Sequence, residues 1–279
     1  MLFFLLQPPR IFDRITENDG KAGEIMNSSK DYIAVFDSGV GGISVLRQLR
    51  SQMPQERFYY FGDCANAPYG TRPTGEIRDL TLAAAEKLMA KGIKALVIAC
   101  NTATAAAITA LREKYPDTIV VGIEPALKSA AKAFPGGTIG VMATPATLRE
   151  TKFAHLMELF ATECTVIKLP AVGLVELIEA GKADTSETAN LLSDLLSPYA
   201  GKLDALVLGC THYPFAAKTV SAILGEKTQL FDGGIGTAQH TRRRLEAANL
   251  LWNGPGEVVI ETSDPEKEAL CRSLLEAEL

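Results

Sequence analysis

Short apolar runs alternate with helical patterns along the chain from Asp31 onward. Two early stretches repeat apolar residues every three or four positions and predict helices, with buried faces at Ile43, Leu46, Leu49 and Met53 and at Ile77, Leu80, Ala84 and Leu88. The apolar runs predict strands at Ile33–Phe36, Phe58–Phe61, Ala95–Ala99, Thr118–Val121, Thr138–Met142, Thr165–Leu169, Ala205–Leu208, Gln229–Phe231 and Glu257–Ile260. A last helix is predicted from about Asp264. The fold class is therefore predicted to be α/β, doubly wound and mostly parallel.

The chain also contains an internal repeat. The segment Ile93–Cys100 resembles Leu203–Cys210, 110 residues later, with a cysteine at the same place. Upstream, Ile33–Ser38 is echoed weakly by Ile139–Thr144, 106 residues later. Two echoes in the same order predict two similar α/β domains with the active site in the cleft between them. We expect an N-terminal extension over 1–30, a first domain over 31–124 plus 231–279, and a second domain over 125–230.

Composition restricts the class of protein. The chain has 279 residues, of which 47% are hydrophobic and 22% charged, as is typical of globular proteins. The formal net charge of −5 argues against nucleic acid as the main partner. No apolar run approaches the ~18 residues of a membrane span, and residues 1–6 lack the features of a signal peptide. We therefore expect a cytoplasmic protein that does not bind membranes.

Two cysteines occupy equivalent strand ends. Cys100 and Cys210 each follow a predicted strand and precede a predicted helix. Asn101 or Thr102 is predicted to cap the first helix and Thr211 the second. The positive end of a helix dipole favours a thiolate. An unperturbed thiol is only about 3% ionised at pH 7, so a cysteine that acts as a base needs this help.

Other readings of these residues stay open. The spacing of Cys210 and His212 is too tight for the usual zinc site and no C-x-x-C pair is present, so we expect no metal. A disulfide between Cys100 and Cys210 is geometrically feasible, although redox dithiols usually lie close in sequence. Asp37 could simply cap a helix, and His212 could be a packed core residue. The turn Ser38–Gly42 could cradle an anion, but it lacks the third glycine of a dinucleotide fingerprint.

One activated thiol from each of two facing halves suits the inversion of a stereocentre. Inversion removes a proton from one face and returns a proton to the other, so it needs two acid/base groups on opposite sides of the substrate. Two similar half-domains that enclose a small molecule provide this arrangement.

At these residues the chain resembles the cofactor-independent Asp/Glu racemase family, and within it the members that act on glutamate. The resemblance runs from about Asp31 to Leu245 and is carried by Phe36–Gly42, Gly62-Asp63, Pro68–Gly70, Ala99–Ala103, Val121–Ala126, Leu208–Pro214 and Phe231–Gly234. It implies reversible conversion of L-glutamate to D-glutamate, which supplies D-glutamate for peptidoglycan, without a cofactor.

The resemblance also implies roles for individual residues. Cys100 takes the proton from D-glutamate with help from Asp37, and Cys210 takes it from L-glutamate with help from His212. The residues implied to hold the carboxylates and the amine are Ser38, Pro68, Tyr69, Gly70, Asn101, Thr102 and Thr211. A further family glutamate falls nearest Glu179 on the predicted helix Ala171–Ala180, although Glu176 fits nearly as well.

Partners follow from the same resemblance, and rival functions remain. The N-terminal extension resembles that of enteric members, which are activated by UDP-N-acetylmuramoyl-L-alanine; a surface tail without a regulatory role is the other interpretation. A homodimer is a further expectation. The rival functions are an aspartate racemase of the same family, a two-lobed small-anion-binding protein, and a thiol hydrolase or transferase with one nucleophilic cysteine.

Overall fold

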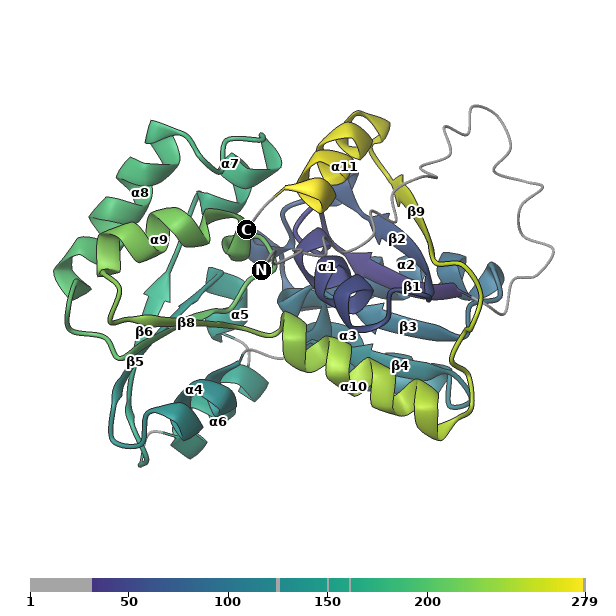
Figure 1. Cartoon of the computed structure of the whole chain (residues 1–279), viewed down its shortest axis with the longest axis horizontal. Helices are drawn as coiled ribbons and strands as arrows, with labels where there is room; N and C mark the ends of the chain where they lie inside the picture. Colours follow the sequence, from purple (N-terminus) through teal and green to yellow (C-terminus); the bar gives the residue numbers. More distant parts are fainter. Residues whose placement is uncertain (1–31, 124–125, 150, 161, 278–279) are drawn as a thin grey trace, which may run out of the picture.

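A computed structural model of the chain describes residues 32–123, 126–149, 151–160 and 162–277, so the predicted extension over 1–30 lies outside the described residues. The described chain forms two lobes side by side, each built around one sheet (Figure 1). The first lobe is drawn at the right of the figure and the second lobe, in green, at the left.

Each lobe contains an entirely parallel sheet. The strands of the first lobe are β1 (Tyr32–Asp37), β2 (Arg57–Gly62), β3 (Ala95–Ile98), β4 (Ile119–Gly122) and β9 (Glu257–Thr262), in the spatial order β4-β3-β1-β2-β9. Those of the second lobe are β5 (Thr138–Ala143), β6 (Thr165–Pro170), β7 (Ala205–Leu208) and β8 (Gln229–Asp232), in the order β6-β5-β7-β8. The predicted α/β class with parallel sheets is confirmed.

The two sheets repeat the same pairing register. Ile33 of β1 pairs with Ala95 of β3, and Ile139 of β5 pairs with Ala205 of β7. These pairs are separated by the same 106 and 110 residues as the sequence echoes. The β3–β4 and β7–β8 pairings match in the same way. The lobes are therefore similar in strand order and register, as the internal repeat predicts.

Helices cover both faces of each sheet. In the first lobe they are α1 (Ile43–Gln52), α2 (Thr74–Ala90), α3 (Asn101–Lys114), α10 (Gly234–Ala247) and α11 (Glu268–Glu276). In the second lobe they are α4 (Leu127–Ala133), α5 (Pro145–Arg149), α6 (Thr151–Phe160), α7 (Leu174–Glu179), α8 (Ser186–Leu196) and α9 (Ala217–Leu224). Successive strand residues point to opposite faces, so Ala34 and Phe36 pack with α2 and α3, whereas Ile33 and Val35 pack with α1 and α10. One apolar cluster contains residues of both lobes, and this shared core holds them together.

The chain enters the second lobe once and then returns. Strand β8 pairs in the second sheet, and α10, which begins at Gly234, packs against α1 in the first lobe. The predicted domain limits, 31–124 plus 231–279 and 125–230, stay a prediction.

Two helices begin later than the sequence pattern indicates. The helix predicted over Ala171–Ala180 begins only at Leu174, because Gly173 has a left-handed backbone with φ of 88° that no regular helix accommodates. The helix predicted from about Asp264 is preceded by the 3₁₀ turn η6 (Pro265–Lys267), so α11 begins at Glu268.

One ion pair is buried in the first lobe. Lys94 Nζ lies 2.7 Å from Glu56 Oε2, and the two side chains are 5% and 2% exposed. Lys94 also donates to the carbonyl of Leu250, and Glu56 accepts from the backbone N–H of Trp252. The pair therefore ties the sheet to the segment that precedes β9.

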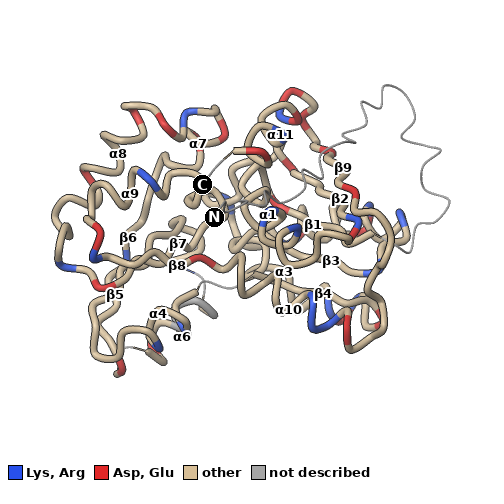
Figure 2. The backbone as a smooth tube through the Cα atoms, viewed as in Figure 1, with Lys and Arg blue, Asp and Glu red and all other residues tan. Residues whose placement is uncertain are grey.

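Other charged residues are spread over the surface of both lobes, with the two signs interspersed (Figure 2). Within the described ranges, no helix combines the length and the apolar character that crossing a bilayer requires.

Candidate active site

The two cysteines lie where strands of the two lobes end. Cys100 follows β3 by two residues, and Cys210 follows β7 by two residues. Both are buried, with exposed fractions of 5% and 9%. Because β3 and β7 occupy equivalent places in their sheets, the cysteines occupy equivalent places in the two lobes.

Cys100 caps the helix that follows it. Helix α3 begins at Asn101, and Cys100 Sγ accepts a hydrogen bond from the N–H of Ala103 at 3.4 Å. The prediction that Asn101 or Thr102 caps this helix is wrong, because both already belong to the first turn of α3. Ser38 Oγ lies 3.4 Å from the same sulfur.

Cys100 is a thiol, against the prediction that the helix dipole favours its thiolate. Burial and the negative charge of Asp37 raise the pKa of Cys100 to about 12, outweighing the hydrogen bonds from Ser38 and Ala103. The prediction is wrong because burial removes most of the solvation that a charged sulfur needs and Asp37 adds a like charge nearby.

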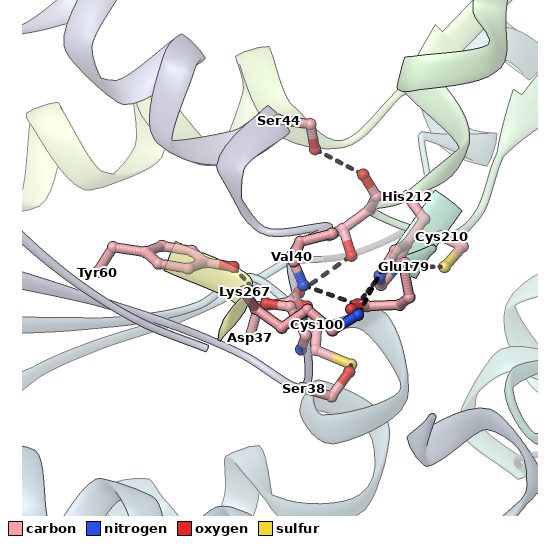
Figure 3. Close-up of polar contacts among 12 residues, drawn as sticks. Asp37, Ser38, Val40, Ser44, Tyr60, Cys100, Glu179, Cys210, His212 and Lys267 are labelled. Carbon is pink, nitrogen blue, oxygen red and sulfur yellow. Dashed lines mark hydrogen bonds and ion pairs between the residues drawn. The ribbon is translucent and has the colours of Figure 1, made fainter. Parts of the chain in front are cut away.

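Cys210 has different neighbours. The residues after it form the 3₁₀ turn η5 (Tyr213–Ala216). The prediction that Thr211 caps a helix is therefore wrong, and Thr211 instead donates to Asp37 Oδ2 at 3.0 Å. His212 Nδ1 lies 3.6 Å from Cys210 Sγ, and His212 Nε2 lies 2.6 Å from Glu179 Oε1 (Figure 3). The Cys210 sulfur, the His212 imidazole and the Glu179 carboxylate therefore form a continuous line of polar contacts.

The contacts of His212 favour its charged form. Burial opposes the charge on His212, but its hydrogen bonds to Cys210 and Glu179 outweigh burial and hold the pKa of the imidazole well above its usual range. Burial also opposes the charge on Glu179, but its hydrogen bonds with His212 and Val40 lower the pKa of the carboxyl.

The structure distinguishes the two glutamates that the sequence leaves open. Glu179 Oε1 accepts from the N–H of Val40 at 2.7 Å as well as contacting His212. Glu176 instead lines a surface cavity of about 420 Å³ with Lys182. Glu179 is the residue that reaches the site, where its carboxylate contacts His212 and the glycine-rich turn.

Two glycines permit this close approach of the lobes. A Cβ at Gly39 would lie 1.9 Å from Glu179 Oε1, and a Cβ at Gly41 would lie 2.4 Å from His212 Nδ1. One backbone N–H of this turn, that of Val40, donates to the carboxylate of Glu179.

Asp37 links the lobes from the end of β1. Its carboxylate is fully buried and accepts from Gly39 N and from Thr211 Oγ1, both at 3.0 Å. Burial raises the pKa of Asp37 to about 6, against the lowering effects of the His212 charge and of the hydrogen bonds from Gly39 and Thr211.

The predicted residues near Pro68 lie on the Cys100 side. Pro68 precedes the 3₁₀ turn η3 (Tyr69–Thr71), and the buried Tyr69 donates from its hydroxyl to Asp63 Oδ2 at 2.7 Å. Gly70 approaches Thr144, since a Cβ there would lie 2.9 Å from Thr144 Cβ.

A group of buried hydroxyls joins the lobes beside Gly70. Thr102 Oγ1 lies 3.4 Å from Thr144 Oγ1 and 3.1 Å from Thr147 Oγ1. Sequence reasoning missed Thr144 and Thr147. The repeat held a signal for the first, because Thr144 follows Ser38 by 106 residues.

Asn101 carries an unpaired acceptor. Its Oδ1 is buried and has no hydrogen-bond partner within the part of the chain that the structure describes. Asn101 lines a cavity of about 10 Å³ with Cys210 and Thr211. That volume holds at most one water. An unpaired buried acceptor suits a ligand that carries an N–H donor.

No group of three or more His, Cys, Asp or Glu side chains that could hold a metal ion occurs among the described residues.

Comparison with known proteins assigns the class. A family model described as Asp/Glu/Hydantoin racemase matches residues 42–241, which is more than half of the chain. The chain belongs to this family and is therefore an enzyme of the isomerase class. Membership of this family excludes the alternative that the chain is a two-lobed small-anion-binding protein without enzymatic activity.

Particular relatives narrow the comparison. Glutamate racemase of Clostridium perfringens (strain SM101 / Type A) is 49% identical over 219 residues, covering 78% of this chain and 84% of the relative. The structure of glutamate racemase isoform RacE1 from Bacillus anthracis has a TM-score of 0.80 at 29% identity, covering 90% of this chain and 96% of that chain. Escherichia coli glutamate racemase in complex with L-glutamate and the activator UDP-MurNAc-ala has a TM-score of 0.78 at 32% identity, covering 88% and 94%.

Proposed function

We propose that this enzyme is a glutamate racemase in which one of Cys100 and Cys210 removes the Cα proton and the other returns a proton to the opposite face. The observation that carries the proposal is the pair of buried cysteines at equivalent strand ends of two similar lobes. The names of the relatives support glutamate as the substrate. The rival with one nucleophilic cysteine leaves the second cysteine and its histidine without a role.

In the direction from L- to D-glutamate, Cys210 is the base. Its thiolate, beside the His212 imidazolium that Glu179 holds, takes the Cα proton and becomes a thiol. The resulting carbanion receives a proton on its other face from the Cys100 thiol, which becomes a thiolate. One proton is removed and one is returned, so the substrate's charge is unchanged. The reverse reaction begins with the Cys100 thiolate and ends with the Cys210 thiolate.

The remaining polar groups would bind the substrate. The unpaired Oδ1 of Asn101 and the carboxylate of Asp37 are acceptors suited to an ammonium group. The groups proposed to hold the two carboxylates are the hydroxyls of Ser38, Thr102 and Thr211 and the turn Pro68–Gly70. The negative charge of Asp37 raises the pKa of Cys100, which makes the Cys100 thiolate a stronger base when D-glutamate is the substrate.

The wider role follows from the reaction. We propose that the product D-glutamate is used in peptidoglycan synthesis, and that the enzyme is cytoplasmic. Activation by UDP-N-acetylmuramoyl-L-alanine is proposed by analogy with the Escherichia coli relative, whose structure contains that activator. A homodimer stays a prediction.

The test is proton exchange at Cα in D₂O. Wild-type enzyme with L-glutamate and no added cofactor is expected to yield D-glutamate with one deuterium at Cα. Cys100→Ala and Cys210→Ala should each lower racemisation by at least about 10²–10⁴-fold, because each removes one acid/base group. Cys164→Ala is the matched control: Cys164 is a buried thiol of the second lobe that donates to the Phe160 carbonyl, away from the site. Retained racemisation in either site variant contradicts the two-base proposal, and turnover of aspartate alone contradicts glutamate as substrate.

A further inference from the structure

A lysine near the carboxyl end of the chain reaches the proposed site from the opposite lobe. Lys267 lies in η6, and its Nζ donates to the backbone carbonyl of Glu179 at 2.8 Å. Figure 3 shows Lys267 beside Glu179 and the chain of contacts that leads to Cys210. Lys267 lies outside the matched family segment 42–241, and no sequence motif points to it.

The carbonyl that Lys267 contacts belongs to the end of a helix. Glu179 is the last residue of α7, and the final carbonyls of a helix lack partners within the helix. A lysine at this end satisfies a carbonyl and complements the negative pole of the helix. Because α7 has only six residues, its position depends on contacts with other elements more than on its own hydrogen bonds.

The same glutamate is held at both its backbone and its side chain. Its carbonyl accepts from Lys267, and its carboxylate accepts from Val40 and contacts His212. The charge of Lys267 also contributes to lowering the pKa of the Glu179 carboxyl. Both effects keep an ionised carboxylate at the ring nitrogen of His212 that faces away from Cys210.

We propose that Lys267 is a positioning residue that supports proton transfer at Cys210 and not at Cys100. The inference rests on the proposed racemase function. Lys267 acts through Glu179 and His212, and it makes none of the contacts found at Cys100, whose partners are Ser38 and Ala103. Loss of Lys267 therefore slows one of the two proton transfers.

Isotope effects test this asymmetry directly. The variant Lys267→Met is compared with wild type using glutamate deuterated at Cα, once as the L and once as the D enantiomer. We expect kcat/KM to fall on the order of tenfold, the size expected for one hydrogen bond to a charged group. The isotope effect on kcat/KM should rise with deuterated L-glutamate, because transfer to Cys210 becomes more rate-limiting. The isotope effect on kcat/KM should fall with deuterated D-glutamate, because proton transfer to Cys100 then limits the rate less than it does in wild type.

Two further variants control the experiment. Lys267→Arg keeps a charged donor and should keep both isotope effects near those of wild type. Lys182→Met removes a half-exposed lysine close to the same end of α7, where it pairs with Glu187, and should change neither rate nor isotope effects.

The outcomes separate the two proposals. Unchanged isotope effects in Lys267→Met, whatever its rate, overturn the positioning role, as does a variant that no longer unfolds cooperatively, because Lys267 would then be a purely structural residue. A wild-type enzyme that does not racemise glutamate overturns the proposed function, and the role of Lys267 with it.

Discussion

Substitution of Gly41 by alanine tests the contact between the glycine-rich turn and His212. The added Cβ would lie 2.4 Å from His212 Nδ1, 2.6 Å from His212 Cε1 and 2.6 Å from Thr211 Oγ1. Non-bonded atoms of this kind pack best at about 3.5 Å, so the imidazole must retreat by about 1 Å. Gly41 has no left-handed backbone angle, so alanine strains the contact and not the backbone.

The cost can be estimated from the hydrogen bonds of His212. A shift of about 1 Å disrupts its contacts to Cys210, at 3.6 Å, and to Glu179, at 2.6 Å. A hydrogen bond to a charged group contributes about 1.5–3 kcal/mol, so losing two costs about 3–6 kcal/mol. At 1.36 kcal/mol for each factor of ten, kcat/KM for racemisation is expected to fall about 10²–10⁴-fold.

The assay follows the optical activity of glutamate by circular dichroism, together with thermal unfolding of each variant. Gly75→Ala is the control, because Gly75 lies in α2 and a Cβ there meets nothing within 4 Å. This control should keep full activity and gain up to about 1 kcal/mol of stability from better helix propensity. A Gly41→Ala enzyme with kcat/KM within threefold of wild type would refute the reasoning.

Two further predictions concern buried charges. Because burial raises the pKa of Asp37 to about 6, this residue contributes most stability below its unfolded pKa near 3.8, and the contribution is lost as pH rises through 6. Asp37→Asn should therefore raise the urea midpoint more at pH 8 than at pH 4. The same variant should lower kcat/KM. An equal rise of the urea midpoint at both pH values contradicts the assigned pKa. Lys94→Met removes the cation beside the buried Glu56 carboxylate and should cost about 3–5 kcal/mol in urea unfolding. The double variant with Glu56→Leu should cost less, and a larger cost in the double variant would contradict an ion pair between them.

Hydrophobic periodicity and the internal repeat were sufficient to predict the strands and the parallel α/β class, but not the order of the strands in each sheet. The apolar runs gave the nine strands of the two sheets to within about two residues, because buried parallel strands read as continuous apolar segments. The repeat placed Cys100 and Cys210 at equivalent strand ends, because both register and chain direction are the same in the two lobes.

Features of the site that depend on tertiary contacts could not be predicted from the sequence. Cys100 is a thiol because of its burial and the charge of Asp37 on a neighbouring strand, and neither effect is visible in a local pattern. Glu179 and Glu176 are three residues apart on one short helix, and only the docking of α7 onto the glycine-rich turn distinguishes them. Lys267 reaches the site across 88 residues of sequence, so no spacing rule indicates it.

The path of the chain between the lobes determines the order in which they can be completed during synthesis. All strands of the second sheet lie between Thr138 and Asp232, so this sheet can form as soon as that segment has left the ribosome. The first sheet has its central strands near the amino end, but its edge strand β9 and the covering helices α10 and α11 are made last. The contacts of α1 with α10 and α11 therefore form only after the whole second lobe has been made. Synthesis of the first lobe thus begins before that of the second lobe and ends after it.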